Sequence, residues 1–409
     1  MSISQNFPTT KPALNLDFAR SKRLDPRIFF VRATTGTYVD EDGLIKTARA
    51  DIPRFDHNPT TGESLGLLIE SRRTNLMPYS EDLSNWQLSE SSVSTNTVIA
   101  PDGTLTADKL QENTATNQHL WFRDIGTVSI GAKYTFSCFF KAAERTKIAL
   151  TSHAQGYTIF DLSNGTVSQS GGHSNETIVP YPNGWYRCSI TVTKTDTVGA
   201  FYIVGWTTSN VYAGTTGHGV YAWGGQLENA DYVSSYIPNL STGTTTRFEE
   251  YVLVRETNFS NFYNSNEGTF FATVRKNGFG SAAFFPGIFY AQTDLNNCLG
   301  MAYSDPGADD ILFEAYVSGV NQYYLGGGTT ISDKQYKVIG SYKLNDIAFC
   351  QNGATVQTDS SSLIPTVNQL VIGGLRGGDY ASHALNGTIS KLSYYPVRLT
   401  NSQLQELTK

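Results

Sequence analysis

The residues of this 409-residue chain that are best suited to chemistry are aromatic side chains placed beside amides, imidazoles and guanidiniums. A flat aromatic face can cover the apolar side of a sugar ring, while nearby polar groups hydrogen-bond the ring hydroxyls. Tyr202 and Trp206 share one face of an alternating run. The sequence therefore predicts a glycan-binding site, with the following candidate contacts: His119, Trp121, Arg123, Tyr157, Tyr202, Trp206 and Trp223.

Core packing is the alternative for every one of these aromatic residues. A tryptophan in a sheet more often fills the interior than faces a ligand, and this alternative is favoured for Trp185 and Trp223. The same two alternatives, a binding surface or the interior, apply to five tyrosines of the second half: Tyr290, Tyr316, Tyr323, Tyr324 and Tyr380.

Catalytic signals are weak by comparison. Glycoside hydrolysis normally needs two carboxyl groups on either side of one bond. The acidic clusters, Asp40-Glu41-Asp42, Glu249-Glu250 and Asp309-Asp310, each fall in an expected turn or linker and read as solvated surface. The six histidines are scattered, and none lies in a nucleophile-elbow context. We expect no catalytic residue, although carboxylates from different strands could still meet.

Metal and disulfide signals are also thin. The loop 304–310 (SDPGADD) could offer oxygen ligands to calcium, but it lacks an established calcium-loop pattern, and an ordinary acidic loop is the alternative. We therefore expect no cofactor. The four cysteines, Cys138, Cys188, Cys298 and Cys350, are expected to be buried thiols, with a disulfide in each half left as an alternative.

The elements that must position these residues are β-strands. Apolar and polar residues alternate at period two over many short runs, separated by Gly-, Asn- and Pro-containing turns. Charged residues make up 16% of the chain, below the usual ~25%, and aromatic residues are plentiful. We predict an all-β protein with two antiparallel β-sandwich (jelly-roll) domains, an extended N-terminal segment and a short C-terminal helix. Strands of the second half are expected at 269–274, 336–342, 344–350, 369–372 and 388–394.

Three regions are predicted along the chain. Residues 1–77 hold too few apolar side chains for a core of their own, so they should pack on a neighbouring domain or on another subunit. Residues 78–247 and 248–409 should each form a sandwich, joined by a small polar linker at 241–246. Thr400 with Gln403 reads as a capping box, and Leu399 with Leu404 as a hydrophobic staple, at the start of the final helix.

The charge pattern and the ends of the chain limit the partners. The net charge is −6 and no basic stripe offers a phosphate footprint, so nucleic acid is not expected. The first ten residues lack the basic and apolar regions of a signal peptide, and no apolar stretch is long enough for a membrane helix. We expect production in a cytoplasm without membrane insertion.

Three stretches resemble known families. The ordered motifs Leu16-Asp17-Phe18, Pro53-Arg54-Phe55-Asp56 and Arg73-Thr74-Asn75-Leu76 resemble the N-terminal module of tailed-phage structural proteins. The pieces Gly184-Trp185-Tyr186-Arg187 and Ala222-Trp223-Gly224-Gly225 resemble a jelly-roll carbohydrate-binding module. Leu385-Asn386-Gly387-Thr388-Ile389 and the final helix resemble a concanavalin A-like, laminin G-like domain.

The resemblance implies a virion protein, such as a tail fibre, neck fibre or capsid decoration, that adheres to host surface glycans without catalysis. Its N-terminal segment would bind other virion proteins, and fibre analogy favours a homotrimer. Deleting residues 1–77 should then abolish incorporation into the particle and leave both sandwiches folded. The alternatives are a particle cement or spacer without a glycan ligand and a polysaccharide-degrading enzyme.

Overall fold

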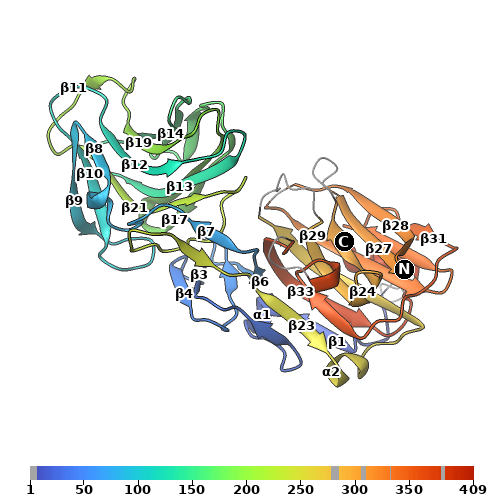
Figure 1. Ribbon diagram of the computed structural model, residues 1–409. Helices are drawn as coiled ribbons and strands as arrows, with labels where there is room; N and C mark the ends of the chain where they lie inside the picture. Colours follow the sequence, from blue (N-terminus) through green and yellow to red (C-terminus); the bar gives the residue numbers. More distant parts are fainter. Residues whose placement is uncertain (1–6, 278–284, 305–309, 332, 379–382) are drawn as a thin grey trace, which may run out of the picture.

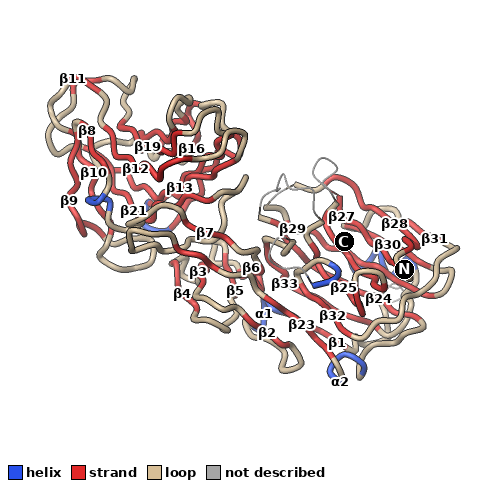
Figure 2. The backbone as a smooth tube through the Cα atoms, in the orientation of Figure 1, coloured by secondary structure: helices blue, strands red, loops and turns tan. Residues whose placement is uncertain are grey.

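The computed structural model describes residues 7–277, 285–304, 310–331, 333–378 and 383–409. Its regular structure is almost entirely antiparallel strand, and Figures 1 and 2 show the strands gathered into two lobes with the N-terminal part of the chain between them. The predicted all-β class is confirmed, together with the short C-terminal helix α3 (Asn401–Thr408).

The first lobe is a sandwich of two antiparallel sheets. One sheet has the strand order β17-β18-β13-β21-β10-β9 and the other β16-β15-β14-β19-β12-β8; the short pair β11-β20 lies apart from both. The strand bounds are β8 (Gln87–Ser89), β9 (Ser91–Val98), β10 (Ala107–Glu112), β11 (Thr116–Asn117), β12 (Leu120–Thr127), β13 (Lys133–Ala142), β14 (Lys147–Ser152), β15 (Thr158–Asp161), β16 (Thr166–Gln169), β17 (Ser174–Tyr181), β18 (Trp185–Thr193), β19 (Val198–Gly205), β20 (Tyr212–Ala213) and β21 (Gly219–Glu228).

Alternation along these strands builds the core between the two sheets. Phe136 and Phe140 on β13 and Ile190 on β18 face inward, where they meet Phe201 and Ile203 from β19 of the opposite sheet. Each position is fully buried, and burying such side chains stabilises the fold by ~25 cal/mol per Å² of apolar surface. The inward faces expected from the period-two pattern are therefore confirmed.

The second lobe is also a sandwich of two sheets, but it recruits strands from both ends of the chain. One sheet has the order β31-β30-β29-β24-β33-β6-β5, with β1 also paired to β33, and the other has the order β2-β23-β32-β25-β26-β27-β28. The strand bounds are β1 (Leu14–Asp17), β2 (Phe29–Val31), β5 (Phe55–His57), β6 (Ser64–Ile69), β23 (Tyr251–Arg255), β24 (Glu267–Lys276), β25 (Gly287–Asp294), β26 (Asn297–Tyr303), β27 (Asp310–Val317), β28 (Val320–Thr329), β29 (Gln335–Lys343), β30 (Ile347–Gln351), β31 (Gln357–Asp359), β32 (Gln369–Ile372) and β33 (Gly387–Tyr395).

The N-terminal segment supplies strands and core residues to the second lobe. Leu14 of β1 pairs with Tyr394, Leu68 of β6 pairs with Thr388, and Leu14 and Ile69 lie in the same buried cluster as β24 and β33. The prediction that this segment packs on a neighbouring domain is confirmed. The topology argues against the expectation that both sandwiches stay folded without residues 1–77, because the deletion would remove β1, β2, β5 and β6 from the sheets of the second lobe.

The same segment also contacts the first lobe. Its hairpin, β3 (Gly36–Val39) and β4 (Ile45–Ala48), places Ile45 in a buried cluster with Phe139, Trp185 and Trp223 of the first lobe. The Thr37 hydroxyl donates to the main-chain oxygen of Tyr236. Residues 1–77 are thus a bridge between the lobes. Their predicted roles in anchoring and oligomerisation stay predictions.

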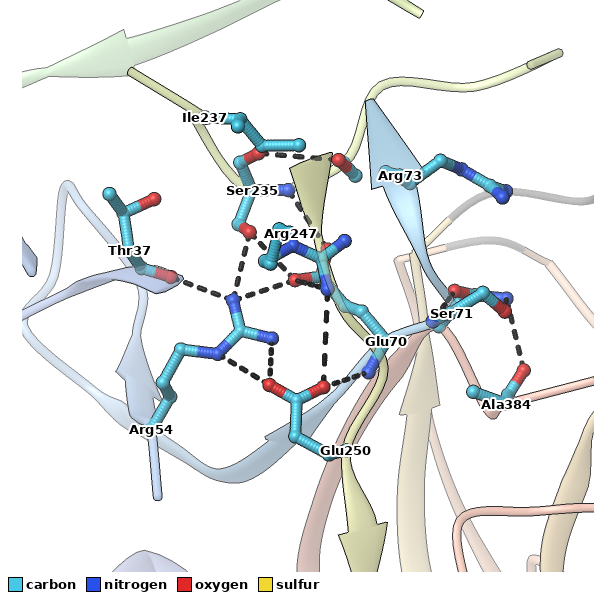
Figure 3. Close-up of polar contacts among 12 residues, drawn as sticks. Thr37, Arg54, Glu70, Ser71, Arg73, Ser235, Ile237, Arg247, Glu250 and Ala384 are labelled. Atoms are coloured by element: carbon cyan, nitrogen blue, oxygen red, sulfur yellow. Dashed lines mark hydrogen bonds and ion pairs between the residues drawn. The ribbon is translucent and has the colours of Figure 1, made fainter. Parts of the chain in front are cut away.

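A buried ion-pair cluster lies where the segment meets the two lobes (Figure 3). Glu250 accepts hydrogen bonds from Arg32 at 3.2 Å and from Arg54 at 2.5 and 2.9 Å, and its second oxygen accepts the main-chain N–H of Glu70 at 2.9 Å. The carboxylate of Glu70 contacts Arg54 at 2.7 Å and Arg247 at 3.4 Å. All five side chains are almost fully buried, so the cluster joins N-terminal residues to residues that follow the first lobe.

This cluster corrects the interpretation of Glu249-Glu250 as solvated surface. Glu250 has no exposed area, since Arg32 and Arg54 surround its carboxylate. Burial opposes ionisation of Glu70, yet Arg247 and Arg54 hold the pKa of its carboxyl well below its usual range. Buried charges persist in proteins when they are paired and hydrogen-bonded in this way.

Three other local predictions can be compared with the structure. The expected linker at 241–246 ends in strand β22 (Thr245–Arg247), which pairs with β7 (Arg73–Asn75). The expected strand at 344–350 begins only at β30, because residues 344–346 form a turn closed by the Asp346 N–H donating to the Lys343 oxygen. The capping box of α3 is confirmed by reciprocal hydrogen bonds between Thr400 and Gln403.

Candidate functional site

Strands β14, β19 and β12 lie side by side in the first lobe (Figure 1), and the outer face of this sheet carries partly exposed aromatic residues. Along β19, Phe201 and Ile203 point into the core, so Tyr202 and Val204 point outward, as the alternation predicts. Phe122 lies opposite Tyr202 in the antiparallel register and is also partly exposed. The strand period therefore places aromatic rings on a solvent-facing surface.

Two aromatic pairs form on this face. The rings of Phe122 and Tyr202 stack, with centroids 5.0 Å apart and planes inclined by 25°. The rings of Tyr157 and Trp206 lie 5.5 Å apart at 49°. Tyr157, Tyr202 and Trp206 also pack against one apolar patch, formed by Ala149, Ile159 and Val204. The structure thus brings three of the predicted glycan contacts together, from positions up to 49 residues apart in the sequence.

A cavity of about 170 Å³ opens beside these rings. Its lining combines Tyr157 and Tyr202 with polar groups from the segment before β12, from β14 and from the loop after β14: Gln118, Thr151, Ser152, His153 and Gln155. The Gln118 amide donates to the Tyr157 hydroxyl at 3.0 Å, which fixes the direction of that ring. We call the four aromatic residues Phe122, Tyr157, Tyr202 and Trp206, together with this cavity, the outer-sheet site.

Asp196, which lies beside His153 of the cavity lining, is held by two partners. His153 Nδ1 lies 2.9 Å from Asp196 Oδ2, and Lys194 Nζ lies 3.0 Å from Asp196 Oδ1. The hydrogen bond from His153 lowers the pKa of Asp196 to about 2, with a further contribution from Lys194. Burial raises the pKa of Tyr202, and Asp124 adds to the shift. The site therefore offers neutral hydroxyls and amides around its aromatic rings.

Three predicted contacts lie in the interior. Trp121 is only 1% exposed; it packs between the sheets and donates from Nε1 to the Ser92 oxygen at 3.0 Å. His119 is fully buried, with Nδ1 2.6 Å from the Glu90 oxygen. Trp223 lies in the buried cluster beneath the N-terminal hairpin, as its core alternative predicts. None of these three rings presents a face to solvent.

Arg123 is the remaining candidate, and it lies away from the outer-sheet site. It follows Trp121 by two residues on β12, so its side chain leaves the same face of the sheet as Trp121, opposite to the face of Phe122 and Tyr202. Its guanidinium donates to the Asn85 oxygen at 3.0 Å and lies 5.9 Å from the ring centre of Tyr79.

The tyrosines of the second lobe divide between interior and surface. Tyr290 and Tyr323 are buried, and the Tyr290 hydroxyl donates to Glu314 at 2.7 Å. Tyr316 is partly buried beneath the Arg376 guanidinium, and Tyr324 is 51% exposed. Tyr380 lies outside the described residues.

The structure also locates the cysteines and part of the expected calcium loop. All four cysteines are buried free thiols, so no disulfide joins them. Residues 305–309 of the calcium candidate lie outside the described residues. Among the residues that are described, no group of three or more His, Cys, Asp or Glu side chains could hold a metal ion. Within the same ranges, no helix is long and apolar enough to cross a membrane.

Some members of the outer-sheet site were missed from the sequence. Phe122 lies beside the buried Trp121, so the alternation that places Tyr202 outward also places Phe122 outward. Thr151, His153 and Gln155 come from another strand and its loop, and only the pairing of β14 with β19 brings them to Tyr202. A cross-strand register, which single-sequence patterns do not supply, was needed to find them.

Comparisons with known proteins return structural likenesses only. No protein-family model matches the chain, and no curated protein matches it either. Domain 4 of AbnA, a GH43 extracellular arabinanase from Geobacillus stearothermophilus, solved with arabinotriose, is 13% identical over 44% of this chain and 81% of that chain, with a TM-score of 0.31. The CBM40 of Ruminococcus gnavus IT-sialidase, solved with α2,6 sialyllactose, is 14% identical over 38% and 89% of the two chains, with a TM-score of 0.32.

A third structure aligns with more of the chain. Trypanosoma rangeli sialidase, solved with 2,3-difluorosialic acid, is 13% identical over 78% of this chain and 62% of that chain, with a TM-score of 0.29. At such identities and TM-scores, none of these likenesses carries an argument about function.

Proposed function

We propose that this chain is a glycan-adhesion protein that acts without catalysis, and that the outer-sheet site holds the saccharide. One observation carries the proposal: Tyr157, Tyr202 and Trp206 converge on the exposed face of a sheet beside a cavity lined by amides and hydroxyls. Mixed sites of this kind cover the apolar face of a sugar ring and hydrogen-bond its hydroxyls.

The geometry suits reversible holding of a short segment of glycan. Stacking against Tyr202 and Trp206 would remove apolar ring surface from water, while Gln118 and Thr151 would exchange hydrogen bonds with hydroxyls. The cavity is smaller than the ~300 Å³ at the lower end for drug-sized ligands, so each site would bind weakly. Several copies on one particle would then supply avidity through effective concentration.

We further propose that the particle is a virion. The support is the resemblance of residues 16–76 to the N-terminal module of tailed-phage structural proteins. The homotrimer inferred by fibre analogy and the contacts of this segment with other virion proteins belong to the same proposal. Antibodies raised against the full chain should label purified phage particles from the producing host; labelling of the host cell alone would contradict a virion location.

A glycan array with the full chain tests adhesion. Wild-type protein should bind a defined subset of glycans, and Tyr202→Ala should lose about fivefold or more in affinity, because it removes a stacking face worth ~1–3 kcal/mol. Tyr324→Ala is the matched control, since Tyr324 is an exposed tyrosine of the other lobe. Equal losses for Tyr202→Ala and Tyr324→Ala, or no glycan bound by the wild type, would refute the outer-sheet site.

A rigid spacer is the second candidate function. It is favoured by the buried cluster of Arg32, Arg54, Glu70, Arg247 and Glu250, which fixes the bridging segment between the lobes. A chain that binds no glycan yet remains in purified particles would support this reading. Turnover of any array glycan by the wild type would instead support an enzyme.

A further inference from the structure

A second cavity, of about 230 Å³, lies where the bridging segment meets both lobes. Its walls come from the hairpin β3-β4 and strand β5, from β17 and β18 of the first lobe, and from Arg275 and Asp333 of the second lobe. Ligand sites favour such junctions between domains. We call this space the junction cavity. Its lining includes Glu70 of the ion-pair cluster, together with Thr37 and Ser235, which accept hydrogen bonds from Arg54 of that cluster (Figure 3).

The junction cavity holds a carboxylate and a guanidinium that are not paired with each other. Asp56 accepts the Val39 N–H at 2.7 Å with one oxygen, and a second backbone hydrogen bond, from His57, also stabilises its carboxylate. Arg187 is 8% exposed, and it donates to the Ser234 oxygen at 2.8 Å and to the Ser137 hydroxyl at 3.2 Å. In the described part of the chain Arg187 forms no ion pair, and its Nε has no partner.

An aromatic ring and two hydroxyls complete the wall formed by the first lobe. Tyr181 is half-buried at the end of β17 and meets Phe139 edge-on, with ring centroids 5.1 Å apart. On the same face, the hydroxyls of Thr177 and Ser189 lie 2.6 Å apart. The cavity therefore offers, within one enclosure, a tyrosine ring, hydroxyls that donate or accept, a carboxylate acceptor and a guanidinium donor.

We propose that the junction cavity is a second saccharide site and that it takes one neutral sugar ring. Ring hydroxyls would donate to the carboxylate of Asp56, and the ring would lie against Tyr181, since both residues line the cavity. A net anion or cation would be disfavoured, because Asp56 and Asp333 oppose Arg187 and Arg275 in the lining, so an ionic ligand that gains one partner also faces a like charge. The proposal rests on the proposed function only in taking a glycan as the ligand; it does not need the outer-sheet site to bind.

The test uses saturation-transfer NMR with glucose, galactose and N-acetylglucosamine as neutral probes and glucuronic acid and glucosamine as charged ones. The full chain carries Tyr202→Ala and Trp206→Ala, so that the outer-sheet site does not contribute. A further change, Val179→Trp, fills the cavity from a residue that is 39% exposed and lies in its lining. Val320→Trp, at a residue 63% exposed in the other lobe, is the matched control.

We expect at least one neutral probe to bind this background, with an unchanged signal in the Val320→Trp control and a loss of at least tenfold in affinity with Val179→Trp. A milder variant, Asp56→Asn, keeps an acceptor for the Val39 N–H and should weaken binding about tenfold by removing the charged acceptor. Circular dichroism and melting curves confirm that each variant is folded.

Binding that survives Val179→Trp, a preference for the charged probes, or no binding of any probe would overturn the junction site. The two proposals fail separately. Loss of array binding in Tyr202→Ala concerns the outer-sheet site, whereas the Val179→Trp comparison concerns only the junction cavity.

Discussion

Replacing Glu250 by glutamine removes the charge at the centre of the junction while preserving the size of the side chain. The Glu250 carboxylate accepts from Arg32 at 3.2 Å and from Arg54 at 2.5 and 2.9 Å, and it also accepts the main-chain N–H of Glu70. A glutamine oxygen could retain some of these hydrogen bonds. It cannot neutralise the guanidiniums, which have no access to water.

The size of the effect follows from the charges in the cluster. Three guanidiniums, of Arg32, Arg54 and Arg247, and two carboxylates, of Glu70 and Glu250, give a formal charge of +1, which Glu250→Gln raises to +2. Removing one partner of a buried ion pair costs about 3–5 kcal/mol. For a domain of 150–250 residues each kcal/mol corresponds to ~2–4 °C, so the melting temperature should fall by roughly 6–20 °C.

Differential scanning calorimetry on the full chain is the assay, and the adjacent residue supplies the control. Glu249 pairs with Arg72 at 3.0 Å, but the Arg72 side chain is 47% exposed. Glu249→Gln should therefore cost no more than ~1 kcal/mol. If Glu250→Gln and Glu249→Gln melt within a degree of each other, the cluster does not stabilise the junction and the reasoning from buried charge is refuted.

Three further predictions concern the same framework. In urea titrations, Gly66→Ala should destabilise the second lobe by about 1–3 kcal/mol more than Gly126→Ala destabilises the first lobe, to which Gly126 belongs. Both glycines have positive φ, but of the two only Gly66 would bring a Cβ against a backbone oxygen, at 2.3 Å. Equal losses of stability in the two lobes would contradict the clash. Burial raises the pKa of Asp56 from 3.8 to about 6, so the stabilisation from its protonated form is complete below pH 4 and is lost as the pH rises through 6. The free energy of unfolding of the wild type should therefore fall relative to that of Asp56→Asn across this pH range. Parallel plots of unfolding free energy against pH for the two proteins would exclude the shift. Deleting residues 1–77 should unfold the second lobe in limited proteolysis, whereas deleting residues 1–9 should not; a protease-resistant second lobe in the longer deletion would show that β1 and β6 are dispensable.

Much of the fold could be predicted because period-two alternation is a local signal. Phe201 and Ile203 against Tyr202 and Val204 sort correctly into inner and outer faces from sequence alone. The pairing of Leu14 with Tyr394 could not be predicted, because nothing local to either strand specifies a partner 380 residues away. Short apolar runs such as those in residues 1–77 show that a segment needs a partner, but not which one.

The candidate site shows the same limit. Tyr157, Tyr202 and Trp206 were predicted as contacts and lie together, because each occupies an outward or loop position. Trp121 and His119 were predicted beside them and lie inside, since the residue types that suit a sugar also suit a core. The sequence around Glu250 does not indicate that its carboxylate is buried. Its partners Arg32 and Arg54 lie about 200 positions earlier in the chain, so only the fold brings them to Glu250.

The pairing of β7 with β22 has a consequence for how the protein is made. The chain leaves the second lobe through Arg73–Asn75 and re-enters it through Thr245–Arg247, directly alongside, so the first lobe is a cassette inserted into a discontinuous domain. During synthesis the cassette can fold before the second lobe, because all of its strands are synthesised before β23. The strands that precede it must wait for β33, which is synthesised after the whole cassette, before their sheet can close. At the β7–β22 pair, one inserted domain could be exchanged for another, in evolution or by design, without interrupting either sheet of the second lobe.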